Sequence, residues 1–253
     1  MRILVCIKQV PDSTVRVKVG ADGKSVATDG ITWAISPYDE YAMELALERK
    51  DADPSTVVSV VTVGPSRSRD ALRQALAMGA DDATLVTGAA AEAAGGIALG
   101  SALATVVREI GPDVVLVGRQ ASDDEQGLVG AALAHALGWP LLTNVERWTG
   151  DEIWRATEGG HEVWKATGPA VLSVQRSEKE PRYPSLPGIM KAKKKEIPEK
   201  DLASLDGGAA PSPSVVAMEP PPARGGGKIF KEGDVKQHAA AIAKALRDEA
   251  KVL

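Results

Sequence analysis

Long apolar runs recur between residues 2 and 175, at the spacing expected of buried strands. They are "RILVCI" (2–7), "TVVSVVTVG" (56–64), "DATLVT" (82–87), "DVVLVG" (113–118) and "PAVLSVQ" (169–175). Strands of a parallel sheet are covered by helices on both faces, so they are apolar throughout instead of alternating with polar residues. We therefore predict a mostly parallel sheet built from these five segments.

Stretches with helical periodicity alternate with the apolar runs. They are "PYDEYAMELALERK" (37–50), "SRSRDALRQALAMG" (66–79), "IALGSALATVVREIG" (97–111) and "QGLVGAALAHALG" (126–138). Three of the four end on glycine, a common residue just past a helix C-terminus. The alternation predicts a doubly wound, Rossmann-like α/β domain over residues 1–176, a fold that often binds nucleotides.

The pattern changes after residue 140. The segment "EIWRATEGGHEVWKAT" (152–167) has two strand-like halves that meet at Gly159 and Gly160. Paired glycines between two such halves favour a tight turn. We expect a β-hairpin inserted in the domain near residues 150–166.

The C-terminal part of the chain has little core-forming pattern from about Arg176 onward. Prolines at 211, 213 and 220–222 and glycines at 225–227 indicate an extended arm over residues 199–253. The arm ends in the amphipathic pattern "DVKQHAAAIAKALRDEA" (234–250), with Asp234 as a reasonable N-cap. Such a helix needs a surface to lie on, either its own domain or a partner.

One segment between the domain and the arm is unusual. "YPSLPGIMKAKKKEI" (183–197) places Leu186, Ile189 and Met190 beside a dense cluster of lysines. Pro184 and Pro187 disfavour a helix in the first half, and no strand-like alternation is present. We therefore predict that residues 177–198 form a loop with an exposed apolar element, whereas the alternative is that Ile189 and Met190 fold back onto the core.

Composition narrows the classes of function. Only 4% of the residues are aromatic, with one Phe, so the core must be aliphatic. The net charge of -4 and the pI near 5.5 argue against a dedicated nucleic-acid-binding protein, although the lysines at 191–195 keep that as a weak alternative. A single cysteine, Cys6, excludes an internal disulfide and a cysteine-based metal cage, and its apolar surroundings indicate a buried, inert thiol.

The N-terminus lacks the pattern of a signal peptide, and no apolar run is long enough to span a bilayer. These features suggest a protein of the bacterial cytoplasm or of an organelle matrix.

Candidate binding residues follow three of the predicted strands. Ligands of open α/β sheets lie beyond the carboxyl ends of the strands. The three ends are at residues 6–10, at 63–66 and at "GRQASDDEQGLVG" (118–130), where a polar loop leads into a helix whose N-terminus favours a phosphate. Ordinary turns between strand and helix account for the same residues about equally well.

No catalytic set is recognisable. His135, His161 and His238 lie in three different predicted elements, and neither a P-loop nor a G-x-G-x-x-G motif is present. Adjacent acidic residues at 123–125 could bind a divalent ion but are more often helix caps. The residues alone predict a nucleotide site without catalytic groups, and hence not an enzyme.

Several stretches together resemble the β subunit of electron transfer flavoprotein. They are "ILVCIKQVPD" (3–12), "GITWAISPYDEYAMELAL" (30–47), "VTVGP" with "ALRQALAMGAD" (61–81), "DVVLVGRQASDDEQGLVG" with "ALGWP" (113–140) and "EPRYPSLPGIMKAKKKEI" (180–197). They occur in the family's order and cover most of the chain except about its final quarter.

The resemblance implies a heterodimer in which an α subunit makes most contacts to a redox-active FAD. That FAD would accept electrons from acyl-CoA or other flavin dehydrogenases and pass them to a membrane quinone oxidoreductase or another acceptor, as in fatty acid β-oxidation. The β subunit would hold AMP as a structural element, and its C-terminal arm would pack on the α subunit.

The resemblance also implies residues for each role. The AMP site would comprise Cys6, Ser36, Pro37, Tyr38, Asp39, Val63, Gly118, Gln120, Asp123, Asp124, Glu125, Gln126, Gly127, Leu128, Val129, Gly130, Ala131, Ala132 and Leu133. The segment that docks dehydrogenases would comprise Leu186, Pro187, Gly188, Ile189, Met190 and Lys191, with Leu186 as the side chain that enters the partner's pocket.

This sequence departs from the family pattern in places. Ser13 stands where some members have an aromatic residue near the flavin, and Gly127 and Val129 replace the Asn and Thr of the AMP type. In an electron-bifurcating type a second FAD occupies the AMP site, and Val129 alone favours that type. Neither "GGIALGS" (95–101) nor Ala131 fits the bifurcating pattern. AMP is therefore the favoured ligand, and a second FAD at the same site is the alternative ligand. An alternative function is that of a stand-alone nucleotide-binding regulatory protein.

Overall fold

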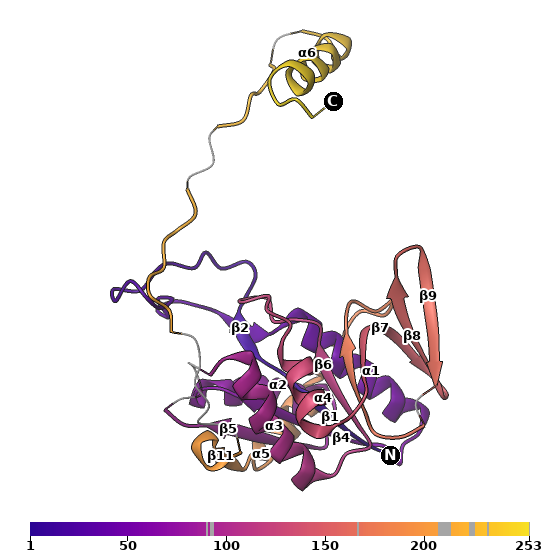
Figure 1. The fold of residues 1–253 in the computed structure, drawn as a ribbon. Helices are drawn as coiled ribbons and strands as arrows, with labels where there is room; N and C mark the ends of the chain where they lie inside the picture. Colours follow the sequence, from indigo (N-terminus) through magenta and orange to yellow (C-terminus); the bar gives the residue numbers. More distant parts are fainter. Residues whose placement is uncertain are drawn as a thin grey trace. The chain divides into compact units, whose positions relative to one another are not determined.

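The apolar runs form a central sheet, described in a computed structural model that covers residues 1–89, 91, 94–165, 167–206, 214–222, 226–231 and 233–252. The chain divides into two compact units, Met1–Met218 and Glu219–Leu253. The sheet belongs to the first unit. Among the described residues nine strands pair in the order β11 (Glu199–Asp201), β5 (Asp82–Thr87), β4 (Val57–Val63), β1 (Arg2–Cys6), β6 (Val114–Gly118), β10 (Ala170–Val174), β7 (Leu141–Thr149), β8 (Glu152–Thr157) and β9 (Gly160–Lys165) (Figure 1).

Helices cover both faces of this sheet. Alternate residues of β1 point to opposite faces, so Ile3 and Val5 join one core cluster, whereas Leu4 and Cys6 join the other. The first cluster includes residues of α1 (Pro37–Ala52) and α2 (Arg69–Met78), and the second includes residues of α3 (Gly96–Ile110) and α4 (Val129–Leu137). The predicted doubly wound α/β fold with a mostly parallel sheet is confirmed.

The strand order reverses beside β1. The chain proceeds from β1 to β4 and β5 on one side and then crosses to β6 on the other side, with all of these strands parallel. The carboxyl ends of β1 and β6 therefore form a topological switch point, where open α/β sheets bind ligands.

The predicted hairpin is present as β8 and β9, which pair antiparallel. It is not isolated, because β8 also pairs antiparallel with β7, and β7 pairs parallel with β10. The sequence pattern did not predict β7, since this strand is buried only at Val145 and Trp148 and has no unbroken apolar run. The hairpin thus extends the main sheet as an antiparallel edge (Figure 1).

The prediction of a loop at residues 177–198 is wrong for its second half. Residues Leu186–Lys194 form the helix α5. Ser185 is its N-cap, with its side chain accepting a hydrogen bond from the N–H of Gly188. Pro187 lies in the first turn, where proline is tolerated because its missing N–H would have no partner within the helix. Prolines at 184 and 187 therefore define where this helix begins instead of preventing it.

The expected start of the extended arm at residue 199 is also corrected. β11 pairs parallel with β5 and lengthens the sheet, and a short 3-10 helix, η2 (Leu202–Ser204), follows it. Leu202 and Leu205 are buried in the second core cluster. The three residues of β11 are all charged, so the sequence has no apolar pattern that would predict this strand. Its place in the sheet comes from backbone pairing with β5.

Three short elements complete the first unit. β2 (Gln9–Pro11) and β3 (Trp33–Ile35) form a two-stranded antiparallel ribbon just after β1, and the 3-10 helix η1 (Ser66–Ser68) leads into α2. The second unit contains α6 (Val235–Asp248), for which Asp234 is the predicted N-cap and forms a capping box with Gln237. Within the described residues, no helix combines the length and apolar character needed to cross a membrane.

Candidate functional site

The side chain of Asp39 connects the two strand ends at the switch point. Its carboxylate accepts one hydrogen bond from the N–H of Lys8, just past β1, at 2.8 Å and another from the N–H of Gly118, at the end of β6, at 3.0 Å. A Cβ on residue 118 would lie 2.2 Å from Oδ1 of Asp39, so only glycine allows this approach. The start of α1 is thereby fastened across the point where the strand order reverses.

Asp39 is buried and has a strongly perturbed pKa. Burial raises the pKa of its carboxyl to about 7, and the two N–H donors and the positive charge of Lys8 lower it only in part. Burial, followed by the charge of Asp39, also raises the pKa of the Cys6 thiol far above its usual range. Cys6 is therefore a buried thiol that stays protonated, as the sequence predicted.

Ser36 is the N-cap residue of α1 but makes no capping hydrogen bond. Its side chain is fully buried, and its hydroxyl oxygen has no hydrogen-bond partner within the described part of the chain. Buried polar groups are normally paired, but the hydroxyls of Ser59 and Thr62 on β4 also lack a partner among the described residues, so this feature does not by itself indicate a ligand. Ser36 is held in place by its own N–H, which donates to the carbonyl of Lys8 at 2.9 Å.

The polar loop between β6 and α4 is tied to the same place by Lys8. The ammonium group of Lys8 contacts Asp123 at 2.8 Å and Asp124 at 2.9 Å. These ion pairs raise the pKa of Lys8, although burial acts in the opposite direction. The sequence placed Lys8 within the candidate strand end at residues 6–10 but gave this side chain no role of its own. We call Cys6, Lys8, Ser36, Asp39, Gly118 and the loop 119–128 the switch-point site.

The N-terminus of α4, beside this loop, has no side-chain cap. Leu128 is its N-cap and supplies no side-chain hydrogen bond, and no acidic residue lies in the first turn. The first amides of such a helix attract anions. The loop that precedes it contains two residues with positive φ, Glu125 (50°) and Gly127 (63°). Asp123 and Asp124 of the loop are thus bound by Lys8, and the first turn of α4 carries no carboxylate of its own.

Some of the predicted site residues lie at the switch point, and others pack in the core. Ser36, Asp39, Gly118 and the loop meet at the switch point, and Val63 ends β4 on the other side of β1. The residues of α4 serve packing as well. Leu133 is fully buried in the core, Gly130 lies against Val117, and Ala132 lies against Gly100 of α3. Within the described part of the chain, no three metal-ligating side chains come together.

The second candidate surface is the helix α5. Leu186, Ile189 and Met190 lie on one face, with 77%, 36% and 57% of their surfaces exposed, and Tyr183 just before the helix is 92% exposed. Ala192, by contrast, is buried against the core that contains α2. The predicted apolar element is therefore exposed, and the alternative in which Ile189 and Met190 fold back onto the core is not what the structure has.

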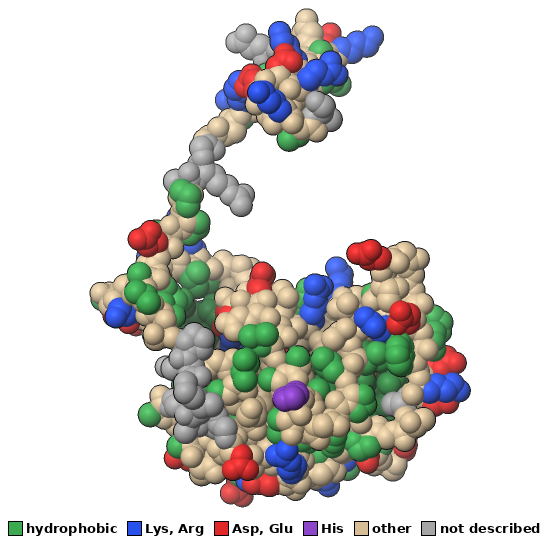
Figure 2. Space-filling model, in the orientation of Figure 1, with side chains coloured by type: hydrophobic (Ala, Val, Ile, Leu, Met, Phe, Trp, Pro, Cys, Tyr) green, Lys and Arg blue, Asp and Glu red, His purple; other side chains and the backbone are tan. Residues whose placement is uncertain are grey.

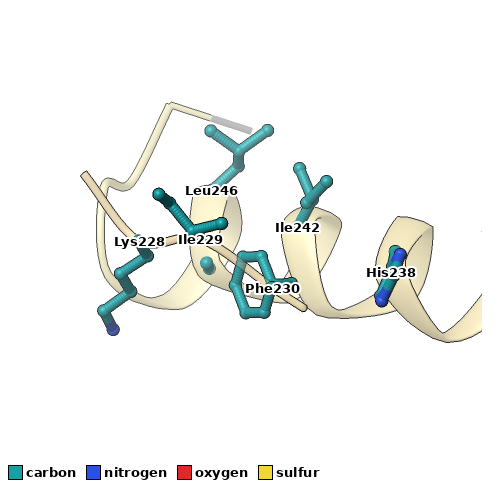
Figure 3. A pocket seen from close by; sticks show the side chains of 7 residues that line it. Lys228, Ile229, Phe230, His238, Ile242 and Leu246 are labelled. Atoms are coloured by element: carbon teal, nitrogen blue, oxygen red, sulfur yellow. The ribbon is translucent and has the colours of Figure 1, made fainter. Parts of the chain in front are cut away.

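A third surface belongs to the C-terminal unit. Ile229 and Phe230 lie along α6 together with Ile242 and Leu246, and with Lys228, His238 and Ala245 they line a groove of about 520 Å³ (Figure 3). No residue of α6 is buried. An amphipathic helix with an open apolar face is typical of a segment that binds another protein surface.

On the face drawn in Figure 2, hydrophobic side chains form several patches, with charged groups mainly toward the edges. Ile97 of α3 and Leu128 before α4 are among the exposed large apolar residues of the chain. Exposed apolar surface on several elements is consistent with a protein that works in contact with others.

Comparisons with known proteins agree along the length of the chain. Residues 24–205 match the family model of the electron transfer flavoprotein domain. The chain is 35% identical over 256 residues to electron transfer flavoprotein subunit beta of Megasphaera elsdenii, covering 94% of each chain, and 36% identical over 233 residues to that of Mus musculus, covering 90% and 91%. It is 35% identical over 260 residues to subunit CarD of the caffeyl-CoA reductase-Etf complex of Acetobacterium woodii, covering 98% and 99%.

Proposed function

This chain belongs to the electron transfer flavoprotein family, and from that premise we propose that it is the β subunit of a heterodimeric electron carrier that holds AMP at the switch-point site. Its role is to bind and position other components: an α subunit with the redox-active FAD, and flavin dehydrogenases that donate electrons. FAD, when bound, supplies the electron storage, and the residues of this chain supply the scaffold.

The meeting of the ends of β1 and β6 beside the uncapped start of α4 is the observation that carries the nucleotide proposal. Open α/β sheets bind their ligands at a switch point of this kind. Asp123 and Asp124 are acceptors suited to ribose hydroxyls or the adenine amino group, and the uncapped start of α4 suits the phosphate.

We propose that the α subunit binds the apolar groove of the C-terminal unit. The groove and the open face of α6 present Phe230, Ile242 and Leu246 without cover in this unit. Apolar anchors of this kind bind a helix or a groove on a partner protein. Burial of this face against the α subunit would also explain why the C-terminal segment forms a unit of its own.

Dehydrogenases are proposed to dock on α5. Leu186 is an exposed apolar anchor, and three lysines in the last turn, Lys191, Lys193 and Lys194, provide positive charge. An apolar anchor supplies affinity at the centre of a small interface, and charge increases the rate of encounter with an acidic surface. The partner face would be an acidic rim around an apolar pocket.

Nucleotide analysis tests the proposal. The chain is co-expressed with its α subunit, and the nucleotides released from the purified complex are identified by mass spectrometry. One AMP and one FAD per heterodimer is the expected result. A stable, isolated chain that binds no α subunit and no nucleotide would overturn the proposal and favour a stand-alone protein.

The same measurement decides the second candidate, a second FAD in place of AMP. The specific observation in its favour is Val129 at the start of α4, together with the match to a subunit of a reductase complex. Two FADs and no AMP per heterodimer would establish this alternative.

A further inference from the structure

We propose that Arg73 of α2 is a positioning residue for the docking helix α5 and acts through Leu186. Its guanidinium donates hydrogen bonds through Nη1 to the carbonyls of Ala192 and Lys195, at the C-terminal end of α5. This inference rests on the proposed function, because it concerns how the docking surface is held.

The helix α5 cannot keep its shape by itself. It has nine residues, and isolated helices shorter than about 12 residues are only marginally stable in water. It also contains Pro187 and Gly188, two residues with poor helix propensity. Leu186 is largely exposed, so burial of its own side chain does not position it. The position of Leu186 must come from contacts elsewhere on the helix.

The N-terminal half of α5 is placed by a close approach to α2. A Cβ on residue 188 would lie 2.3 Å from the carbonyl oxygen of Ala77, the penultimate residue of α2. Ala192, one turn further along, is buried on the same side. Gly188 and Ala192 therefore bring the backbone of α5 directly against the neighbouring helix.

Arg73 completes the attachment at the other end. The carbonyls at a helix C-terminus lack the regular helical partner, and one side chain here serves the carbonyls of both Ala192, which also accepts the N–H of Lys195, and Lys195. Arg73 adds a positive charge next to Lys191, Lys193, Lys194 and Lys195, which is electrostatically unfavourable. An arginine at this place is therefore explained by its hydrogen bonds to the helix end and not by charge pairing.

Arg69, one turn earlier on α2, is a matched control. Its guanidinium donates to the carbonyl of Ile197 at 3.2 Å and pairs with Glu199. These contacts lie beyond the end of α5 and fasten the connection to β11. Arg69→Ala removes the same side chain and the same charge from the same helix, but leaves the carbonyls of α5 bound.

The experiment uses the αβ complex as the varied substrate of an acyl-CoA dehydrogenase from the same organism, reduced by its acyl-CoA substrate. Arg73→Ala is expected to raise the KM for the complex about tenfold, which corresponds to roughly 1.4 kcal/mol. The kcat and the flavin content stay at wild-type values. Arg73→Lys keeps a hydrogen-bond donor and the positive charge, so its KM should lie between that of the wild type and that of Arg73→Ala. Arg69→Ala leaves the KM within about twofold, because surface changes away from a contact have small effects.

A double variant separates this inference from the proposed function. If Arg73 acts through Leu186, the KM of Arg73→Ala with Leu186→Ala equals that of Leu186→Ala alone. If Leu186→Ala has no effect, the proposed docking function is wrong. If Leu186→Ala raises the KM and Arg73→Ala does not, only the role of Arg73 is wrong.

Hydrogen exchange of the αβ complex provides a readout that needs no dehydrogenase. The N–H of Ile189 bonds to the carbonyl of Ser185, and that of Lys195 bonds to the carbonyl of Ala192. Both amides should exchange faster in Arg73→Ala than in Arg69→Ala. Equal exchange in the two variants would overturn the inference.

Discussion

Arg182 donates two parallel side-chain hydrogen bonds to the carboxylate of Glu44, from Nε to Oε2 and from Nη2 to Oε1, each 2.9 Å long. The N–H of Arg182 donates to the same carboxylate at 2.9 Å. The Glu44 side chain on α1 is 1% exposed, so this pair fastens the segment that precedes α5 to the core domain. The docking surface is therefore attached on both sides, by Arg182 before the helix and by Arg73 at its end.

Arg182→Ala should strongly destabilise the protein because the buried carboxylate of Glu44 loses its paired guanidinium and keeps the backbone N–H of residue 182 and the more distant Lys179, 3.8 Å away. Breaking one partner of a buried pair typically costs about 3–5 kcal/mol. The matched control is Arg176→Ala, since Arg176 pairs with Glu180 on the surface, where a pair is worth roughly 0–1 kcal/mol. Thermal unfolding of the αβ complex near neutral pH measures both.

The stability that the Glu44–Arg182 pair contributes depends on pH. Burial acts to raise the pKa of Glu44, but the hydrogen bonds and charge of Arg182 lower it overall. A lowered pKa contributes stability above the pKa of the unfolded chain, and that stability is lost as the pH falls through the folded value. The difference between wild type and Arg182→Ala should therefore shrink on acidification. A difference that grows at low pH would contradict the assignment.

Leu186→Ala should weaken docking while leaving fold and flavin content unchanged. Removing an apolar anchor from an interface typically costs about 1–3 kcal/mol. The measurement is the KM of the αβ complex in electron transfer from an acyl-CoA dehydrogenase. Ile97→Ala is the control, because Ile97 is an exposed aliphatic residue on a different helix, α3. Wild-type kinetics in Leu186→Ala would rule out the anchor.

The lysines of α5 should make docking sensitive to salt. Replacing Lys193 and Lys194 with Gln is expected to raise the KM at low ionic strength and to flatten its dependence on salt, because exposed charges are screened within about 10 Å at 0.1 M. Lys18→Gln with Lys24→Gln serves as control, since both residues are exposed outside α5. An unchanged salt dependence in the α5 variant would exclude electrostatic steering by these lysines.

Gly118→Ala should disrupt the switch-point site. The added Cβ would lie 2.2 Å from the Asp39 carboxylate and 2.9 Å from the Asp39 backbone nitrogen, and that backbone has no room to move. Overpacking of this kind costs roughly 1–3 kcal/mol. We expect a lower melting temperature and loss of the nucleotide from the purified complex. Gly168→Ala is the control, because its Cβ would meet open space.

Asp39→Asn should remove a pH-dependent part of the stability. The folded-state pKa of Asp39, about 7, is above its unfolded value, so the folded state binds the proton more tightly. Stability from this group is greatest at low pH and is lost as the pH rises from about 4 to 7. The Asn variant does not titrate and so does not lose stability over this pH range. Its side-chain NH2 replaces one of the two acceptor oxygens and faces an N–H donor, which lowers stability by about 1–3 kcal/mol at every pH.

The measurement is the melting temperature of the αβ complex between pH 5 and 8. The stability of the wild type relative to Asp39→Asn should be highest at pH 5 and should fall toward pH 8. Lys8 and Asp123 act on the pKa of Asp39 with opposite signs, so Asp123→Asn is a useful comparison: it should lower the pKa of Asp39 and move this fall to lower pH. A constant difference would mean that Asp39 is ionised throughout.

The buried strands and their helices were predictable because an unbroken apolar run is stable in water only where both of its faces are covered. β1, β4, β5, β6 and β10 were predicted from these runs, and their parallel pairing followed from the alternation with helices. The strand-end rule also indicated residues 6–10, Gly118 and the loop after β6 as neighbours before any distance was known, whereas Asp39 was indicated only by the family resemblance. β7 and β11 were missed because each gains its place through backbone pairing and lacks an apolar pattern.

Local pattern alone determined the fold class of this protein, the switch-point location and the exposed apolar element at Leu186, since these depend on periodicity and on which residues can be buried. Only the tertiary structure decided that residues Leu186–Lys194 are helical and how they are held. The reason is physical: a nine-residue helix with two poor helix formers is stable only through groups distant in sequence. Arg73 and Ala192 are 119 positions apart in the sequence, and Glu44 and Arg182 are 138 positions apart, so no local periodicity could predict those contacts.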